Sequence, residues 1–225
     1  VTAPKDLVNL YNLTGEYDKA IELLATHHFR TWEGGREIYW YYVDAHVLKA
    51  LALMKENKDK EAVEYLKKAL LYPENLEVGK PLDDERNAMI YYVMAQAMER
   101  TGNRKEAQQY YRNCVEAKNS HAWPDLKYYQ ALALQKMGDS AKAIELLDHL
   151  AAEGRRRVES LGPVSGIGVE EGGTVANMKS LSEGYYLQGL ASLGKGKKLE
   201  AEEFFIKSLD AYRYNLWAKY YLENF

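Results

Sequence analysis

The chain lacks several features that would assign it to a protein class at first sight. Cys114 is its only cysteine, so no internal disulfide can form. No run of about eighteen apolar residues occurs, and we therefore expect no segment that inserts into a membrane. The formal net charge is only −3, which favours neither nucleic acid nor an anionic membrane as a partner. The chain starts at Val1 without a signal-like apolar segment. We expect a soluble protein, either cytoplasmic or exported after removal of a signal peptide.

The sequence also offers little reactive chemistry. Its histidines show no i, i+4 pair with an acidic third ligand, so no metal site is predicted. No nucleophile lies near a base by helical spacing, and Cys114 is expected in the core. We therefore predict no catalytic residue, no cofactor and no enzymatic activity. Gly166 and Gly168 lack the third glycine and flanking elements of a phosphate-binding loop. Asp83 and Asp84 are expected to cap a helix rather than to form a carboxylate pair or a calcium site.

A six-residue phrase recurs along the chain, opening on a turn residue and ending in alanine. Large apolar residues follow three and four positions after each alanine. The phrases span residues Gly15–Ala20, Asn57–Ala62, Gly102–Ala107, Gly138–Ala143 and Gly196–Ala201. This pattern is typical of a repeated helix–turn–helix, and it predicts a helical solenoid.

Each part of the phrase has a physical basis. Glycine, or asparagine at position 57, can adopt the left-handed conformation that ends one helix and lets the chain reverse. The alanine lets the second helix approach the first closely. A second small residue stands seven positions before four of the turns, at Ala50, Ala95, Ala131 and Gly189, whereas the first unit has Val8. Two small positions facing each other predict tight antiparallel helix pairs.

These positions resemble the tetratricopeptide repeat (TPR) family across nearly the whole chain, and the segment from Gly15 to Leu24 is especially similar to the family pattern. The resemblance implies an all-α fold: a right-handed TPR-like superhelix of about five helix pairs with a C-terminal capping helix. The turns lie 36 to 58 residues apart. The family repeat has about 34 residues, so the connections between helix pairs are enlarged.

We expect one repeat domain over residues 1–225. Its helix pairs are predicted at about 4–28, 37–71, 83–118, 122–153 and 177–211, followed by a capping helix at 212–223. Residues 154–176 contain several glycines and no helical period, and we expect a flexible loop there.

The first helices of such a superhelix line its concave face, so residues at fixed offsets before each turn would point into one groove. Ten residues before three successive turns stand tyrosines, which would form an aromatic ladder. Polar residues follow closer to the turns. The predicted groove residues are Tyr92, Tyr128, Tyr186, Gln96, Glu99, Arg100 and Gln135. Such a surface would bind an extended peptide or a helix, although packing in the core is the alternative role for each tyrosine.

A second resemblance covers residues 32–81, which contain Trp32-Glu-Gly-Gly35 and Ala69-Leu-Leu-Tyr-Pro-Glu-Asn-Leu76. This stretch is similar to the C-terminal part of uncharacterised bacterial proteins in which a β-rich, mutarotase-like region precedes the repeats. It implies that the chain is a module of a longer carbohydrate-active or sugar-binding protein. Trp32 would then contact a sugar or a neighbouring domain, whereas packing against the first helix pair is the alternative.

Two functions therefore follow from the sequence. The first is a non-catalytic protein-interaction or scaffolding module that presents its groove to a protein or peptide, or to an upstream domain of its own polypeptide. The second is the repeat module of the larger carbohydrate-active protein.

Overall fold

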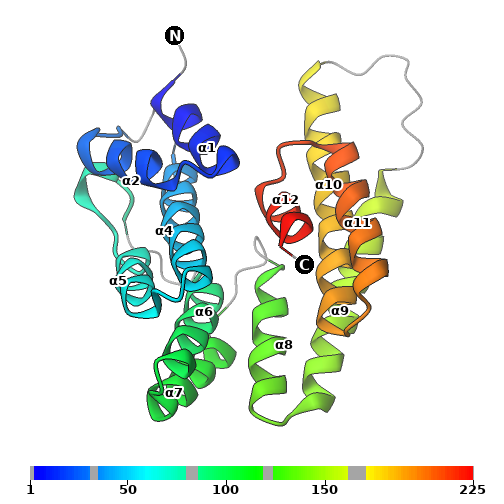
Figure 1. Ribbon diagram of the computed structural model, residues 1–225. Coiled ribbons are helices and arrows are strands. Elements are labelled where there is room, and N and C mark those ends of the chain that lie inside the picture. The colour runs from blue at the N-terminus through cyan, green and yellow to red at the C-terminus, as the bar shows by residue number, and fades with distance from the viewer. Residues whose placement is uncertain (1–2, 31–34, 80–85, 119–123, 162–170, 225) are drawn as a thin grey trace. The chain divides into compact units, whose positions relative to one another are not determined.

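The computed structural model describes residues 3–30, 35–79, 86–118, 124–161 and 171–224, without the side chains of 171–174. These residues form helices and connections and contain no strand (Figure 1). The helices are α1 (Pro4–Thr14), α2 (Tyr17–Thr26), α4 (Glu37–Lys55), α5 (Asp59–Ala69), the short 3-10 helix η1 (Glu74–Leu76), α6 (Asn87–Arg100), α7 (Arg104–Glu116), α8 (Leu126–Lys136), α9 (Ser140–Ser160), α10 (Glu171–Gly194), α11 (Lys198–Ala211) and α12 (Leu216–Glu223). The predicted all-α, TPR-like fold class is confirmed.

The turns within the helix pairs have the backbone conformation that the repeated phrase predicts. The five turn residues all have a positive φ: 79° at Gly15, 61° at Asn57, 83° at Gly102, 88° at Gly138 and 76° at Gly196. A residue in this left-handed region ends the first helix and reverses the chain. The two helices of each pair therefore run antiparallel.

The small residues of the phrase lie where the paired helices approach each other. The alanines that close the phrases, Ala20, Ala62, Ala107, Ala143 and Ala201, are essentially inaccessible to solvent, and so are Ala50, Ala95 and Ala131 on the first helices. In the last pair the small residue is Gly189, and a Cβ there would lie only 2.5 Å from the ring of Phe205. The helix spacing thus depends on the absence of larger side chains.

The chain divides into two compact units, residues 1–120 and 121–225, which are described separately. In unit 1, the long connection after α5 is tied to the first helix pair. The Asn75 side chain donates hydrogen bonds of 2.8 Å to the carbonyls of Leu24 and His27. The backbone amide of Phe29 donates to the carbonyl of Asn75 at 2.7 Å. Asn75 therefore attaches the described part of the enlarged connection to the first helix pair.

In unit 2 the predicted glycine-rich loop at 154–176 is wrong in its extent, because both of its ends are helical. Helix α9 continues to Ser160 and α10 starts at Glu171, so residues 154–160 and 171–176 are helical. Gly154 and Gly184 lie where α9 and α10 cross, and a Cβ on Gly154 would come within 2.6 Å of the Gly184 carbonyl oxygen. A glycine that suggests a helix end in the sequence instead allows two helix backbones to touch. Residues 162–170 lie outside the described residues.

Candidate functional site: a tyrosine-lined face covered by the last helix

In unit 1, the predicted groove residues take part in packing and in contacts between elements. Tyr92 is 8% exposed, and its ring lies 5.9 Å from that of Tyr111 on α7. Gln96 donates a hydrogen bond of 3.3 Å to the Tyr92 hydroxyl. Glu99 accepts a hydrogen bond of 2.9 Å from the Tyr111 hydroxyl. Burial raises the pKa of Tyr92 above its ordinary value, as expected for a core side chain.

Arg100 is directed to the preceding turn rather than to an open groove. Its guanidinium donates to the Met54 carbonyl at the end of α4 and to the Asn57 side chain, at 2.5 and 3.0 Å. It also forms an ion pair of 2.8 Å with Asp59, at the start of α5. Arg100 therefore joins the end of α6 to the turn of the preceding helix pair.

Gln135 has a comparable role in unit 2. Its side-chain amide donates a hydrogen bond of 2.9 Å to the carbonyl of Gly194, the last residue of α10. The carbonyls at a helix end lack partners within the helix, so this bond satisfies one of them. Arg100 and Gln135 thus connect neighbouring helix pairs at their turn ends, whereas Gln96 and Glu99 bond within their own helix pair.

Tyr128 and Tyr186 do come together, around a third tyrosine that the groove prediction did not include. Each is 5% exposed. The Tyr221 ring of α12 lies 5.8 Å from Tyr128, at an interplanar angle of 89°, and 6.4 Å from Tyr186. It also stacks on Phe205 of α11 at 5.6 Å, and its hydroxyl donates to the Tyr129 hydroxyl at 3.0 Å. We call Tyr128, Tyr129, Tyr186 and Phe205 the tyrosine-lined face.

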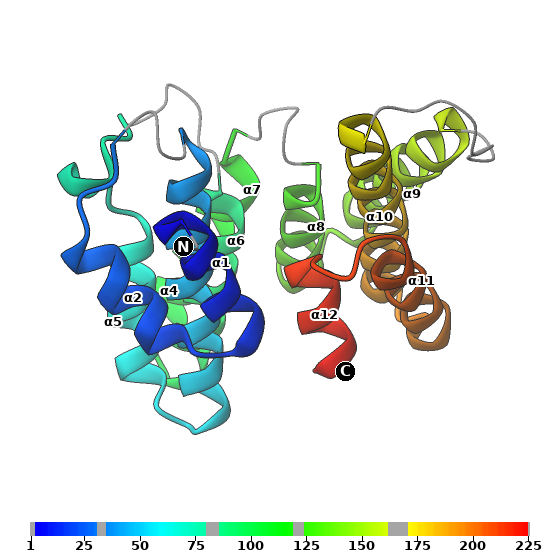
Figure 2. The same cartoon turned by 90° about the horizontal axis from the view of Figure 1, so that it is seen from above.

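Helix α12 therefore lies against α8, α10 and α11 (Figures 1 and 2). Trp217 and Ala218 are buried, which places one side of this short helix in the core of unit 2. The helix corresponds to the predicted capping helix at 212–223, but it begins only at Leu216 because Asn215 forms its N-cap. Its contacts go beyond covering the end of a stack, because its aromatic side chain inserts between the first helices of two successive pairs.

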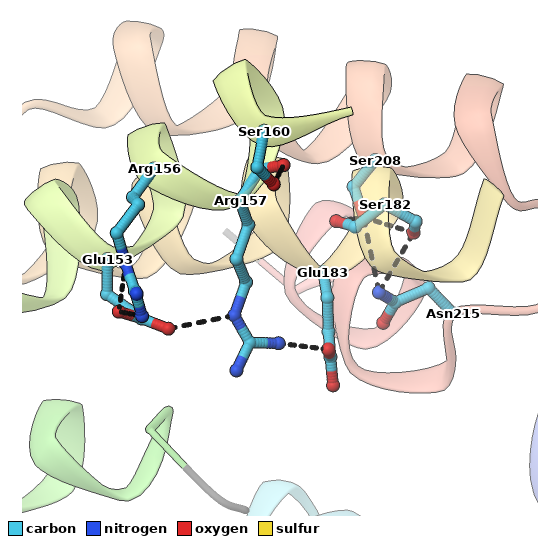
Figure 3. Close-up of polar contacts among 8 residues, drawn as sticks. All are labelled: Glu153, Arg156, Arg157, Ser160, Ser182, Glu183, Ser208 and Asn215. Atoms are coloured by element: carbon cyan, nitrogen blue, oxygen red, sulfur yellow. Dashed lines mark hydrogen bonds and ion pairs between the residues drawn. The ribbon is translucent and has the colours of Figure 1, made fainter. Parts of the chain in front are cut away.

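A buried polar cluster holds the start of α12 (Figure 3). The Asn215 side chain donates to the hydroxyls of Ser182 and Ser208, at 3.1 and 3.2 Å. The two hydroxyls are 2.9 Å apart, and Ser208 also donates to the carbonyl of Ser182. The side-chain Oδ1 of Asn215 accepts a hydrogen bond from the backbone amide of Ala218, so this residue caps α12 as well. One side chain thus starts the helix and attaches it to α10 and α11.

The charged groups of the same region lie on α9 and α10. Arg157 forms an ion pair with Glu183 and a second one, of 3.1 Å, with Glu153, which Arg156 also contacts (Figure 3). These side chains are partly exposed and connect the two helices beside the Gly154–Gly184 crossing.

The two hydroxyls that bond between the tyrosine-lined face and α12 do not titrate near neutral pH. Burial raises the pKa of both Tyr129 and Tyr221 well above the ordinary tyrosine value of 10.0. Both groups therefore act as neutral hydrogen-bonding partners. The arrangement can bind an aromatic side chain with a polar tip.

The remaining sequence predictions have mixed outcomes. Cys114 is buried as expected, and burial raises the pKa of its thiol, which disfavours the reactive thiolate. Trp32, Asp83 and Asp84 lie outside the described residues. Within the described ranges, no group of three or more metal-binding side chains occurs, and none of the helices is long and apolar enough to cross a membrane.

Comparison with known families identifies the repeats. A model described as tetratricopeptide repeat matches residues 43–75 and 88–121, and a second model with the same description matches 125–153. Residues 43–75, 88–121 and 125–153 thus match tetratricopeptide repeats. The three TPR matches span α4 to η1, α6 with α7, and α8 with α9. They do not bear on the mutarotase-like resemblance of residues 32–81, which stays a prediction.

Solved structures that match this chain include MamA, at 20% identity and a TM-score of 0.31, covering 93% of this chain and 90% of that one. YrrB, described as a TPR protein with an unusual peptide-binding site, has 14% identity and a TM-score of 0.32, covering 98% and 90%. A putative kinesin light chain with TPR-like repeats from Podosopora anserina has 16% identity and a TM-score of 0.38, covering 92% of each chain.

Proposed function

We propose that this chain is a non-catalytic protein-interaction module, and that the tyrosine-lined face of unit 2 is a surface on which it binds a helical segment of a protein partner. The observation that carries the proposal is the docking of α12. Tyr221 reaches rings on three helices, from α8 through α10 to α11. A face that accepts one aromatic helix has the chemistry to accept another.

The physical basis is the amphipathic character of tyrosine. A tyrosine ring buries a large apolar area, while its hydroxyl still needs a hydrogen-bond partner. The face supplies both, because Tyr128, Tyr186 and Phe205 surround the ring of Tyr221 and Tyr129 accepts its hydroxyl hydrogen. Recognition of a helix by a groove uses such anchors at helical spacing.

Of the three tyrosines predicted to form an aromatic ladder, this proposal keeps only Tyr128 and Tyr186 of unit 2 as part of the binding surface. Tyr92 packs within its own helix pair, and Arg100 joins neighbouring helix pairs, so neither is retained as a contact with the partner. An upstream domain of the same polypeptide stays an alternative partner for the face. The carbohydrate-active alternative depends on Trp32, which is outside the described residues.

Photo-crosslinking of selected peptides tests the proposal. Helix-forming peptides would be selected from a displayed library against the purified chain and then crosslinked from a photoreactive residue at Leu132. This residue is one helical turn after Tyr128 on α8 and is partly exposed. The matched control carries the photoreactive residue at Leu199 of α11, which is 79% exposed.

We expect the selected peptides to crosslink from position 132 and not from position 199. Equal crosslinking from both positions would place binding elsewhere on the chain. Failure to select any peptide against both the wild-type chain and the Tyr221→Ala variant, in which the docking of α12 is weakened, would remove the interaction function from this unit.

A further inference from the structure

We propose that α12 is a releasable internal ligand of the tyrosine-lined face, and that partners compete with it by presenting a helix with an aromatic residue in the place of Tyr221. This inference rests on the proposed function, since it concerns the same surface. It adds the regulation of that surface and the sequence pattern of the partner.

The pattern of the partner follows from the two anchors of α12. The aromatic anchor is Tyr221, and the polar anchor is Asn215, six positions earlier, whose side chain contacts Ser182 and Ser208. Ala218 between them is fully buried, so a large side chain would not fit at that position. A competing helix therefore needs an amide-bearing N-cap, a small residue three positions later and an aromatic residue six positions later.

We expect α12 to be able to leave while the helix pairs of unit 2 stay folded. The helix has eight residues and follows a short connection after α11, which ends at Ala211. An isolated helix of this length is not stable in water, so α12 exists as a helix only while it is docked. The buried residues at which the paired helices of unit 2 contact each other, such as Ala143, Leu147 and Ala201, belong to α9 and α11 rather than to α12.

The covalent connection sets the affinity that a competitor needs. A segment held by a short linker has an effective concentration on the order of millimolar at its own site. A free peptide at micromolar concentration therefore competes poorly with the intact α12. Weakening the docking of α12 is expected to raise the apparent affinity for the same peptide added in trans.

Binding of a labelled peptide to the full chain provides the first test. The probe is a fluorescent synthetic peptide of residues 212–224, measured by fluorescence anisotropy against the wild-type chain and the Tyr221→Ala variant. We expect the variant to bind the peptide at least about tenfold more tightly than the wild type, because the competing internal helix is weakened. The matched protein control is Tyr214→Ala, which removes a ring that is 53% exposed and should leave peptide binding at the wild-type level.

The peptide itself carries the second control. A peptide with Ala at the position of Tyr221 is expected to lose binding to the Tyr221→Ala chain, because it lacks the aromatic anchor. Equal affinity of wild type and variant for the native peptide, or equal affinity of the variant for both peptides, would overturn the inference.

Hydrogen exchange on the unmodified chain tests release even if Tyr221→Ala fails to fold. Opening of α12 alone predicts that its amides exchange faster than those of α11, with little dependence on denaturant. If α12 exchanges only with global unfolding, it is a permanent part of the core and the inference fails. Crosslinking of library peptides from position 132 would then show binding beside a permanently docked α12, which keeps the interaction function and removes the release. Exchange by local opening without any selected peptide would contradict the function and not the release.

Discussion

His46 makes the stability of unit 1 depend on pH. The side chain is 3% exposed on α4, and its Nδ1 donates to the Tyr42 carbonyl at 2.9 Å. The rings of Tyr42 and Tyr65 lie 4.2 and 6.2 Å away. The pKa of His46 is lowered from 6.5 to about 4, mainly by burial; the backbone hydrogen bond to Tyr42 opposes this shift and the nearby charge of Lys68 adds to it.

The sign follows from proton binding. In the unfolded chain His46 takes up a proton as the pH falls through 6.5, whereas in the folded chain it stays neutral until about pH 4. The unfolded state is therefore favoured progressively across this window. The contribution of the neutral, buried His46 to the stability of the folded chain is fully present above pH 6.5 and is lost as the pH falls towards 4. The total loss is roughly 3 kcal/mol, of which about 2 kcal/mol has occurred by pH 5.

Urea denaturation of the wild type and His46→Gln at pH values between 7.5 and 5 measures this effect. Between these limits the free energy of unfolding of the wild type should fall by about 2 kcal/mol more than that of the variant. The matched control is His149→Gln, whose imidazole on α9 is largely exposed and whose pH dependence should follow the wild type. Parallel pH profiles for wild type and His46→Gln would refute the argument, because the neutral buried imidazole would then contribute nothing.

Three further substitutions test the packing. Gly189→Ala should destabilise the chain by about 1–3 kcal/mol in urea, because the new Cβ meets the Phe205 ring at 2.5 Å; Phe205→Leu in the same chain should recover part of the loss, and strictly additive losses would contradict the clash. Asp44→Ala should cost about 3–5 kcal/mol, because it breaks a buried ion pair of 2.8 Å with Arg86. A loss under about 1 kcal/mol would show that the Arg86 charge is satisfied elsewhere. Arg100→Ala should lower the thermal midpoint by an amount equivalent to about 1 kcal/mol, because it removes bonds to the preceding turn; an unchanged midpoint would make that contact dispensable.

The helix pairs were predictable because the responsible signals are local. A positive φ at Asn57 or Gly102 depends on the residue itself and its immediate neighbours. The burial of Ala62 and Ala107 follows from their fixed distance after those turns. The prediction that the loop begins at Gly154 was wrong, because the role of this glycine is set by Gly184 on the next helix rather than by its neighbours in the sequence.

The candidate site was predictable only in part. The position ten residues before each turn predicted that Tyr128 and Tyr186 lie on one surface, but it did not indicate that Tyr221 of α12 covers them. They also assigned Arg100 and Gln135 to a groove, because spacing along a helix does not tell where a long side chain ends. Both side chains reach polar groups of other elements instead.

The sequence alone thus establishes the helix pairs, their turns and their small contact residues, because these depend on backbone preferences and on periods of a few residues. Tertiary structure determines which surface remains open. Tyr221 bonds to Tyr129 across 92 positions of sequence, and no local preference of either residue encodes that contact. Burial of an aromatic face depends on which distant segment packs against it, and here that segment is the chain's own last helix.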